Sequence, residues 1–147
     1  MAAFTKTAPK RSVTPAQIKE FINEVIERML VLTAKMPPGE ERLRLNTLSY
    51  LDTCVEHCEA RRSLSDVDCL DEEALALTNQ YRKNGCAMME RELSAMGVKH
   101  HATVATQLRK LVEDVVIKET TRHAVINQER ERIWSFIDRL PRQGITL

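Results

Sequence analysis

Glycine and proline are scarce in this chain of 147 residues, which has four of the first and five of the second. Most of them stand where an apolar helical pattern starts or stops. Pro15 opens the first pattern, Pro37, Pro38 and Gly39 follow it, Gly97 precedes the last pattern, and Pro141 follows that one. Because both residue types break or cap helices, this placement divides the chain into long helices with short joints. The sequence therefore predicts an all-α fold.

Long apolar runs and a strong charge of one sign are also missing. No stretch approaches the roughly 20 apolar residues of a membrane-spanning helix, and the formal net charge is only +1. Such a chain has no overall attraction for nucleic acid or anionic lipid. With four cysteines and no secretory pattern, the composition predicts an intracellular, reducing compartment, most simply the cytoplasm, and no membrane partner.

The motifs that carry common enzyme chemistry do not occur. The chain has no phosphate-binding glycine loop, no His-Glu-x-x-His pair and no Gly-x-Ser-x-Gly turn. No glutamate is followed by histidine three residues later, which excludes the usual di-iron bundle pattern. We therefore expect a protein that is not an enzyme and needs no cofactor.

Three potential metal ligands fall on one side of the second helical segment. Cys54, His57 and Cys58 are spaced i, i+3 and i+4, and Cys69 or Cys86 could complete a tetrahedral zinc set. The spacing is not that of a zinc finger, and two of the cysteines lie on the apolar stripe. Buried free cysteine behaves as a small apolar residue, so the sequence favours reduced thiols and no metal site.

An acidic stretch resembles part of a calcium-binding loop. Asp66, Asp68 and Asp71 suggest such a loop, but the pattern needs an oxygen ligand where Leu70 stands and a glycine where Asp71 stands. We therefore interpret the stretch as a solvated loop that caps the following helix.

The first two helices are predicted over residues 15–36 and 40–62. Thr14, Pro15 and Gln17 form the start signal of the first, with a hydroxyl cap, a proline at the first helical position and a glutamine that closes a capping box. The apolar seams are expected to form the core; they comprise Ile18, Ile22, Val25, Met29, Leu32 and Met36 in the first helix and Leu48, Leu51, Val55 and Cys58 in the second.

The third helix is predicted to begin near Asp71, with Gly85 on its apolar stripe. One interpretation ends a short helix at Asn84 and Gly85 and begins another. The other continues a kinked helix to Met96, with Gly85 admitting a neighbouring backbone. The pattern favours the continuous helix.

The longest helical stretch runs from Thr103 to Leu140 and predicts one long C-terminal helix. At about 1.5 Å per residue it would span about 57 Å, whereas a compact domain of this length is about 38 Å across. It must therefore break, project, or pack on another chain. A break near Thr120 and Thr121 would return the end to the first helix. Together the four segments predict a bundle of three similar helices plus this long one.

The far end of the long helix is strongly apolar. A soluble monomer does not usually leave such a patch in water, and aromatic residues dominate the energy of many interfaces. The sequence therefore predicts a protein interface, with a second copy of the chain or another helical subunit, made of Ile126, Ile133, Trp134, Phe136, Ile137 and Leu140.

An alternative is a degenerate helix-turn-helix at about residues 88–110. Gly97-Val98 would supply the turn, and Thr103-Val104 would begin the recognition helix. The distance along the chain from Gly97 to Val104 is one residue longer than this motif requires. The residues that would face nucleic acid are Lys99, His100, Thr103, Gln107, Arg109 and Lys110.

The domain organisation predicted is a flexible basic tail over residues 1–13 and one helical domain over 14–147. The tail has three basic residues and no acidic one, which is typical of a disordered extension. The leading functional hypothesis is a non-catalytic adaptor or scaffold that binds another polypeptide through its last helix, and DNA binding is the alternative.

Overall fold

The computed structural model describes residues 13–65 and 70–142. This part of the chain is all-α, with six helices and no strand. The helices are α1 (Pro15–Lys35), α2 (Glu40–Glu56), α3 (Cys58–Ser63), α4 (Glu72–Ala95), α5 (His101–Arg122) and α6 (Asn127–Asp138). The all-α prediction is confirmed. Of the predicted tail, only Val13 belongs to the described residues. Asp66, Asp68 and Cys69 also lie outside them.

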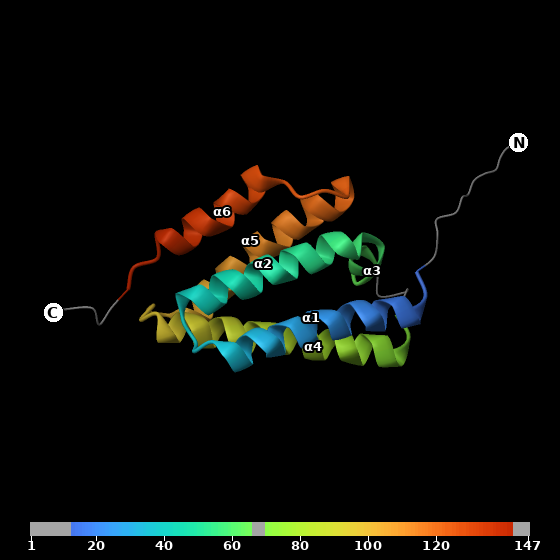
Figure 1. Ribbon diagram of the computed structural model, residues 1–147, viewed down its shortest axis with the longest axis horizontal. Coiled ribbons are helices and arrows are strands. Elements are labelled where there is room, and N and C mark those ends of the chain that lie inside the picture. Colours follow the sequence, from blue (N-terminus) through green and yellow to red (C-terminus); the bar gives the residue numbers. More distant parts are fainter. Residues whose placement is uncertain (1–12, 66–69, 143–147) are drawn as a thin grey trace, which may run out of the picture.

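Four helices surround the core and a fifth lies on their outside. α1, α2, α5 and α4 follow one another around the bundle, since each packs against the next and α4 returns to α1. Figure 1 shows α1 and α4 running in one direction and α2 and α5 in the other. α6 packs on α5, on the side away from α1 and α4. The largest fully buried core side chains include Phe21, Leu43, Leu51, Leu93, Leu108 and Ile133.

The start of α1 is set by local chemistry that the sequence predicted. The Thr14 hydroxyl accepts a hydrogen bond from the Gln17 backbone N–H at 3.2 Å, and the Gln17 side chain accepts one from the Thr14 N–H at 2.9 Å. This reciprocal capping box satisfies two amides that the helix leaves without partners. Asp71 similarly caps α4, because its carboxylate accepts a hydrogen bond from the Ala74 N–H at 2.7 Å.

The turn between α4 and α5 is closed by a Schellman motif. The Val98 N–H donates to the Leu93 carbonyl and the Gly97 N–H to the Ser94 carbonyl, both at 3.0 Å. Gly97 has a φ of 80°, which glycine adopts without strain. Val98 and Leu93 are both buried, so the joint also contributes to the core.

The second predicted helix is divided at His57. Its backbone torsions there are a φ of −122° and a ψ of 48°, which end α2 and begin the short α3. The predicted seam is also shifted: Leu51 and Cys58 are buried, but Leu48 faces outward. The inner face of α2 instead carries Leu43 and Cys54.

The prediction of one continuous helix over 103–140, and with it the arrangement of three helices plus one long one, is wrong. α5 ends at Arg122, and His123 takes the left-handed conformation with a φ of 55°. The Ala124 N–H donates to the Glu119 carbonyl at 3.1 Å and closes the helix end. This break lies close to the alternative considered near Thr120 and Thr121. The chain then turns back as α6, which packs on α5 and reaches α2 through Arg130 and Asp52, whereas the alternative had it return to the first helix. Folding back buries Ile133 and Ile137 fully.

The α4 helix is continuous through Gly85, as the sequence favoured. The reason proposed for that glycine is wrong, because a Cβ at Gly85 would have no heavy atom within 4 Å and no backbone approaches it. Gly85 therefore costs helix stability without relieving a clash. It lies instead beside a cavity in the bundle.

We expect Gly85→Ala to raise the free energy of unfolding by about 0.5–1 kcal/mol, because alanine restricts the unfolded chain and favours a helix. Urea unfolding monitored by circular dichroism measures the change. Gly97→Ala is the control: its positive φ makes the same substitution destabilising. A fall in stability for Gly85→Ala would contradict the open space at this position.

Candidate functional site

An apolar groove runs along the outer surface between α1 and α2. Val31 is 50% exposed, and Leu45 and Leu48 are each 37% exposed. Together with Leu32 they line the groove, whose more polar end is formed by Arg28, Ser49, Asp52 and Glu56. We refer to Val31, Leu32, Leu45 and Leu48 as the α1–α2 strip. It exposes several large aliphatic side chains side by side, which makes it a candidate contact surface.

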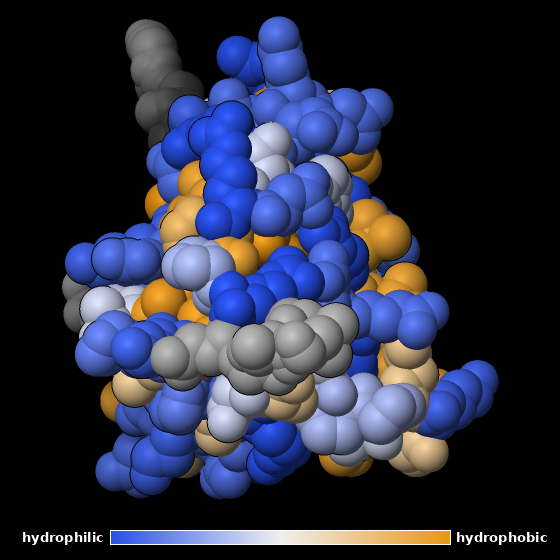
Figure 2. Space-filling view, turned by 90° about the vertical axis from the view of Figure 1, so that its left-hand side faces the viewer, coloured by the Kyte–Doolittle hydropathy of each residue, from blue (hydrophilic) through white to orange (hydrophobic). Residues whose placement is uncertain are grey.

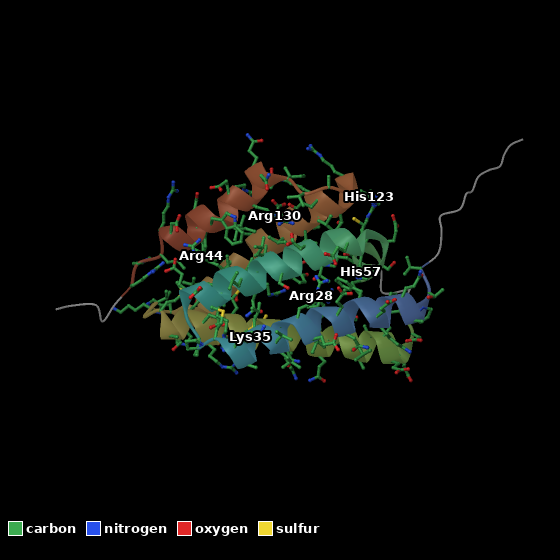
Figure 3. All side chains as sticks on the ribbon, in the orientation of Figure 1. Arg28, Lys35, Arg44, His57, His123 and Arg130 are labelled. Carbon is green, nitrogen blue, oxygen red and sulfur yellow. The ribbon has the colours of Figure 1, made fainter. Side chains whose placement is uncertain are left out.

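The polar end of this strip is built by an ion-pair cluster between α1 and α2. The Arg28 guanidinium donates to the Thr53 hydroxyl at 2.5 Å and to the Glu56 carboxylate at 3.0 Å, and also pairs with Glu24. The His57 Nε2 lies 2.9 Å from the Glu24 carboxylate. Figure 3 shows Arg28 and His57 converging from the two helices. The cluster fixes the two helices that carry the strip.

The same cluster contains the one group of potential metal ligands among the described residues. The ligand atoms of Glu24, Glu56 and His57 lie within 4.8 Å of one another. Arg28 pairs with both carboxylates, so a protein cation already neutralises them. Cys54 and Cys58 do not belong to this group. Burial raises the pKa of Cys54 to about 12, which favours the protonated thiol at neutral pH.

Two salt bridges align α6 with α2 beside the strip. The Arg130 guanidinium of α6 donates to Asp52 of α2 at 2.8 Å, and Arg44 of α2 pairs with Asp138 of α6 (Figure 3). These pairs join α6 to α2, and Figure 1 shows the two helices running in opposite directions. Trp134 of α6 is half-buried and packs against the core.

The predicted interface residues are distributed over two sides of α6. Ile133 and Ile137 point into the core and are fully buried. Phe136 and Leu140 are half-buried and line a separate surface groove with Leu111 of α5. Ile126 is the N-cap residue of α6 and is half-buried. The long-helix geometry that motivated this interface does not exist, and only part of the predicted patch faces outward.

The predicted nucleic-acid residues lie at the end of the molecule where α4 joins α5. Lys99 and His100 are exposed in the joint, and Thr103, Gln107 and Lys110 are exposed on α5. Figure 2 shows this end covered mostly by hydrophilic side chains, with hydrophobic ones between them. Arg109 differs, because it is half-buried and its Nε is buried.

A further feature is a partly open cavity of about 100 Å³ between the helices of the bundle. Residues of α1, α2, α4 and α5 line it. Sequence periodicity could not reveal it, because it forms where four helices fail to fill their common interior. Its one sequence signal is Gly85, which interrupts the apolar stripe of α4 at the cavity wall.

One wall of the cavity is a connected polar network. The Tyr50 and Tyr81 hydroxyls lie 2.8 Å apart, and Tyr50 also donates to Glu113 at 3.0 Å. The Arg61 guanidinium pairs with Glu113 and donates to the Tyr50 oxygen at 3.2 Å. Burial raises the pKa of Tyr81 to about 12 and that of Tyr50 well above its ordinary value, so both phenols are neutral at pH 7.

Comparison of the chain with protein-family models, with curated proteins and with solved structures finds no match. Among the described residues, no helix combines the length and apolar character needed to cross a membrane.

Proposed function

We propose that this protein is a non-catalytic helical adaptor that binds another polypeptide through the α1–α2 strip, in the simplest case a second copy of itself. The observation that carries the proposal is the groove in which Val31, Leu45 and Leu48 lie exposed together. Exposed apolar grooves of this kind accept the apolar face of an amphipathic helix.

The helix beside α2 adds an aromatic side chain that is not fully buried. Trp134 belongs to α6, which Arg44 and Arg130 join to α2, and tryptophan is among the residues that contribute most to binding energy. The ion pairs of Arg28 with Glu24 and Glu56 form a polar rim at one end. An apolar centre with a polar rim is the usual anatomy of a protein interface.

We expect the wild-type protein to be a dimer at micromolar concentration in light scattering, and Val31→Glu with Leu48→Glu to give a folded monomer. Each glutamate would be desolvated without a partner at the contact. Leu75→Glu is the matched control, because Leu75 is also 37% exposed but lies on α4, away from the strip. The control should remain dimeric.

A wild-type protein that stays monomeric at every concentration would contradict self-association. Duplex DNA binding that falls steeply with rising salt, and is lost in Lys99→Ala, would instead favour the nucleic-acid alternative. An apolar contact does not weaken in this way with salt.

A further inference from the structure

The cavity between the helices of the bundle contains two buried donors without a partner. The Asn46 Nδ2 and the Arg109 Nε are the buried side-chain polar atoms that make no hydrogen bond within the described residues. Both side chains line this cavity. Nearly all buried polar groups in native proteins are hydrogen-bonded, so two exceptions in one place indicate a group that these donors are arranged to bind.

The charge balance points to an anion. Arg109 makes no ion pair within residues 13–65 and 70–142, so its positive charge has no protein partner there. The nearest carboxylate on the cavity wall, Glu113, is already held by Arg61 and Tyr50. The Arg109 side chain is only half-buried, but an anion in the cavity that it lines would pair with its charge directly.

Part of the remaining lining is apolar and adaptable. Met29 of α1, Met88 and Met89 of α4 and Val112 of α5 face the same space. Methionine side chains are flexible and fit ligands of irregular shape. A cavity of about 100 Å³ is somewhat smaller than the roughly 150 Å³ cavity that holds benzene in a known engineered case. The ligand therefore has a short apolar body, of about five carbon atoms at most.

We propose that this cavity binds a small carboxylate with a short apolar body. Its two oxygens accept hydrogen bonds from the Asn46 Nδ2 and the Arg109 Nε, and its hydrocarbon part lies among the methionines. A carboxylate fits because one group satisfies both donors and the charge of Arg109. A site in the core of a bundle, built from facing helices, is a common position for a ligand.

The experiment compares three probes of one size: hexanoate, hexan-1-ol and hexylamine, each titrated by calorimetry into the full-length protein. Hexanoate should bind saturably and more tightly than the alcohol, and the amine should not bind. Binding should shift the methyl NMR signals of Met29, Met88 and Met89, but not those of Met36 or Met96, which do not line the cavity.

Two variants test the donors. Arg109→Met should weaken hexanoate binding by about tenfold to a hundredfold, because it removes a charge-assisted hydrogen bond. Arg91→Met, at an exposed position of α4 outside the cavity, should bind as wild type. Asn46→Leu should weaken binding while raising the melting temperature of the ligand-free protein, since it replaces an unpartnered polar group by an apolar one.

Several results would overturn the proposal. Equal binding of hexanoate and hexan-1-ol would show only apolar binding, and undiminished hexanoate binding by Arg109→Met would remove the role of its charge. Ordered water that bridges both donors, with no affinity for hexanoate, would show that solvent occupies the cavity. A melting temperature that falls sharply in Asn46→Leu would show that Asn46 is structurally satisfied.

Discussion

Replacing Arg130 by methionine is expected to lower the free energy of unfolding by about 3–5 kcal/mol, because it leaves a buried carboxylate without its counter-ion. The Arg130 guanidinium binds both oxygens of Glu119, at 2.7 and 2.9 Å, and Glu119 is fully buried. The same carboxylate accepts the Ile126 N–H at 2.9 Å, at the start of α6. This cluster therefore joins the end of α5 to the start of α6.

The measurement is urea unfolding of Arg130→Met beside Arg132→Met on the same helix. Arg132 also forms ion pairs, with Asp114 at 2.9 Å and Glu129 at 2.5 Å, but these lie at the surface. Exposed pairs contribute at most about 1 kcal/mol, so the control should lose little.

Similar losses for Arg130→Met and Arg132→Met would show that α6 does not fold back onto α5 as described. A double variant in which Glu119→Leu accompanies Arg130→Met should recover part of the stability, because it removes the uncompensated charge. Failure of that recovery would indicate that Glu119 acts mainly through the Ile126 N–H.

Replacing Glu92 by alanine is expected to cost about 3–5 kcal/mol for a related reason at the other end of the bundle. Glu92 of α4 is fully buried, and its carboxylate accepts hydrogen bonds from Arg42 at 2.6 Å and from the Gly39 N–H at 2.9 Å. Arg42 also donates to the Met36 carbonyl at 2.9 Å. Loss of Glu92 leaves the buried arginine and the start of α2 without their shared partner.

The control for this variant is Glu73→Ala, also on α4. Glu73 pairs with Lys19 at 2.7 Å, but its side chain is largely exposed. Thermal unfolding should separate the two variants clearly, with a small change for Glu73→Ala. If Glu92→Ala melts with the control, the joint between α1 and α2 is not anchored to α4 by this carboxylate.

Local sequence chemistry was sufficient for most helix boundaries. Thr14 and Gln17 fix the start of α1, Asp71 caps α4, and Gly97 closes the turn before α5. Each signal acts through hydrogen bonds between residues a few positions apart, so it can be recognised without knowing the fold. The continuity of α4 through Gly85 was likewise predictable from its apolar stripe.

The break at His57 was not predicted, and the break at His123 was anticipated only as an alternative near Thr120 and Thr121. Neither position carries glycine or proline, and His123 adopts a left-handed conformation that is uncommon for such a residue. The break at His123 is stabilised by distant contacts: the burial of Ile133 and Ile137 and the bidentate pairing of Arg130 with Glu119. Tertiary packing overrides the local preference for a continued helix.

In the candidate sites, too, the sequence predicted some features and tertiary packing decided others. Periodicity places Leu48 on the apolar face of its helix, yet packing rotates that face and leaves Leu48 on the surface. The sequence named Arg109 as a possible phosphate contact, whereas its Nε is buried and its side chain lines the cavity. By itself the sequence determined the all-α class and the capped ends, since these depend on neighbouring residues. Only the tertiary structure decided the fold-back of α6, the exposed strip and the cavity between the helices, because each depends on how the faces of separate helices meet.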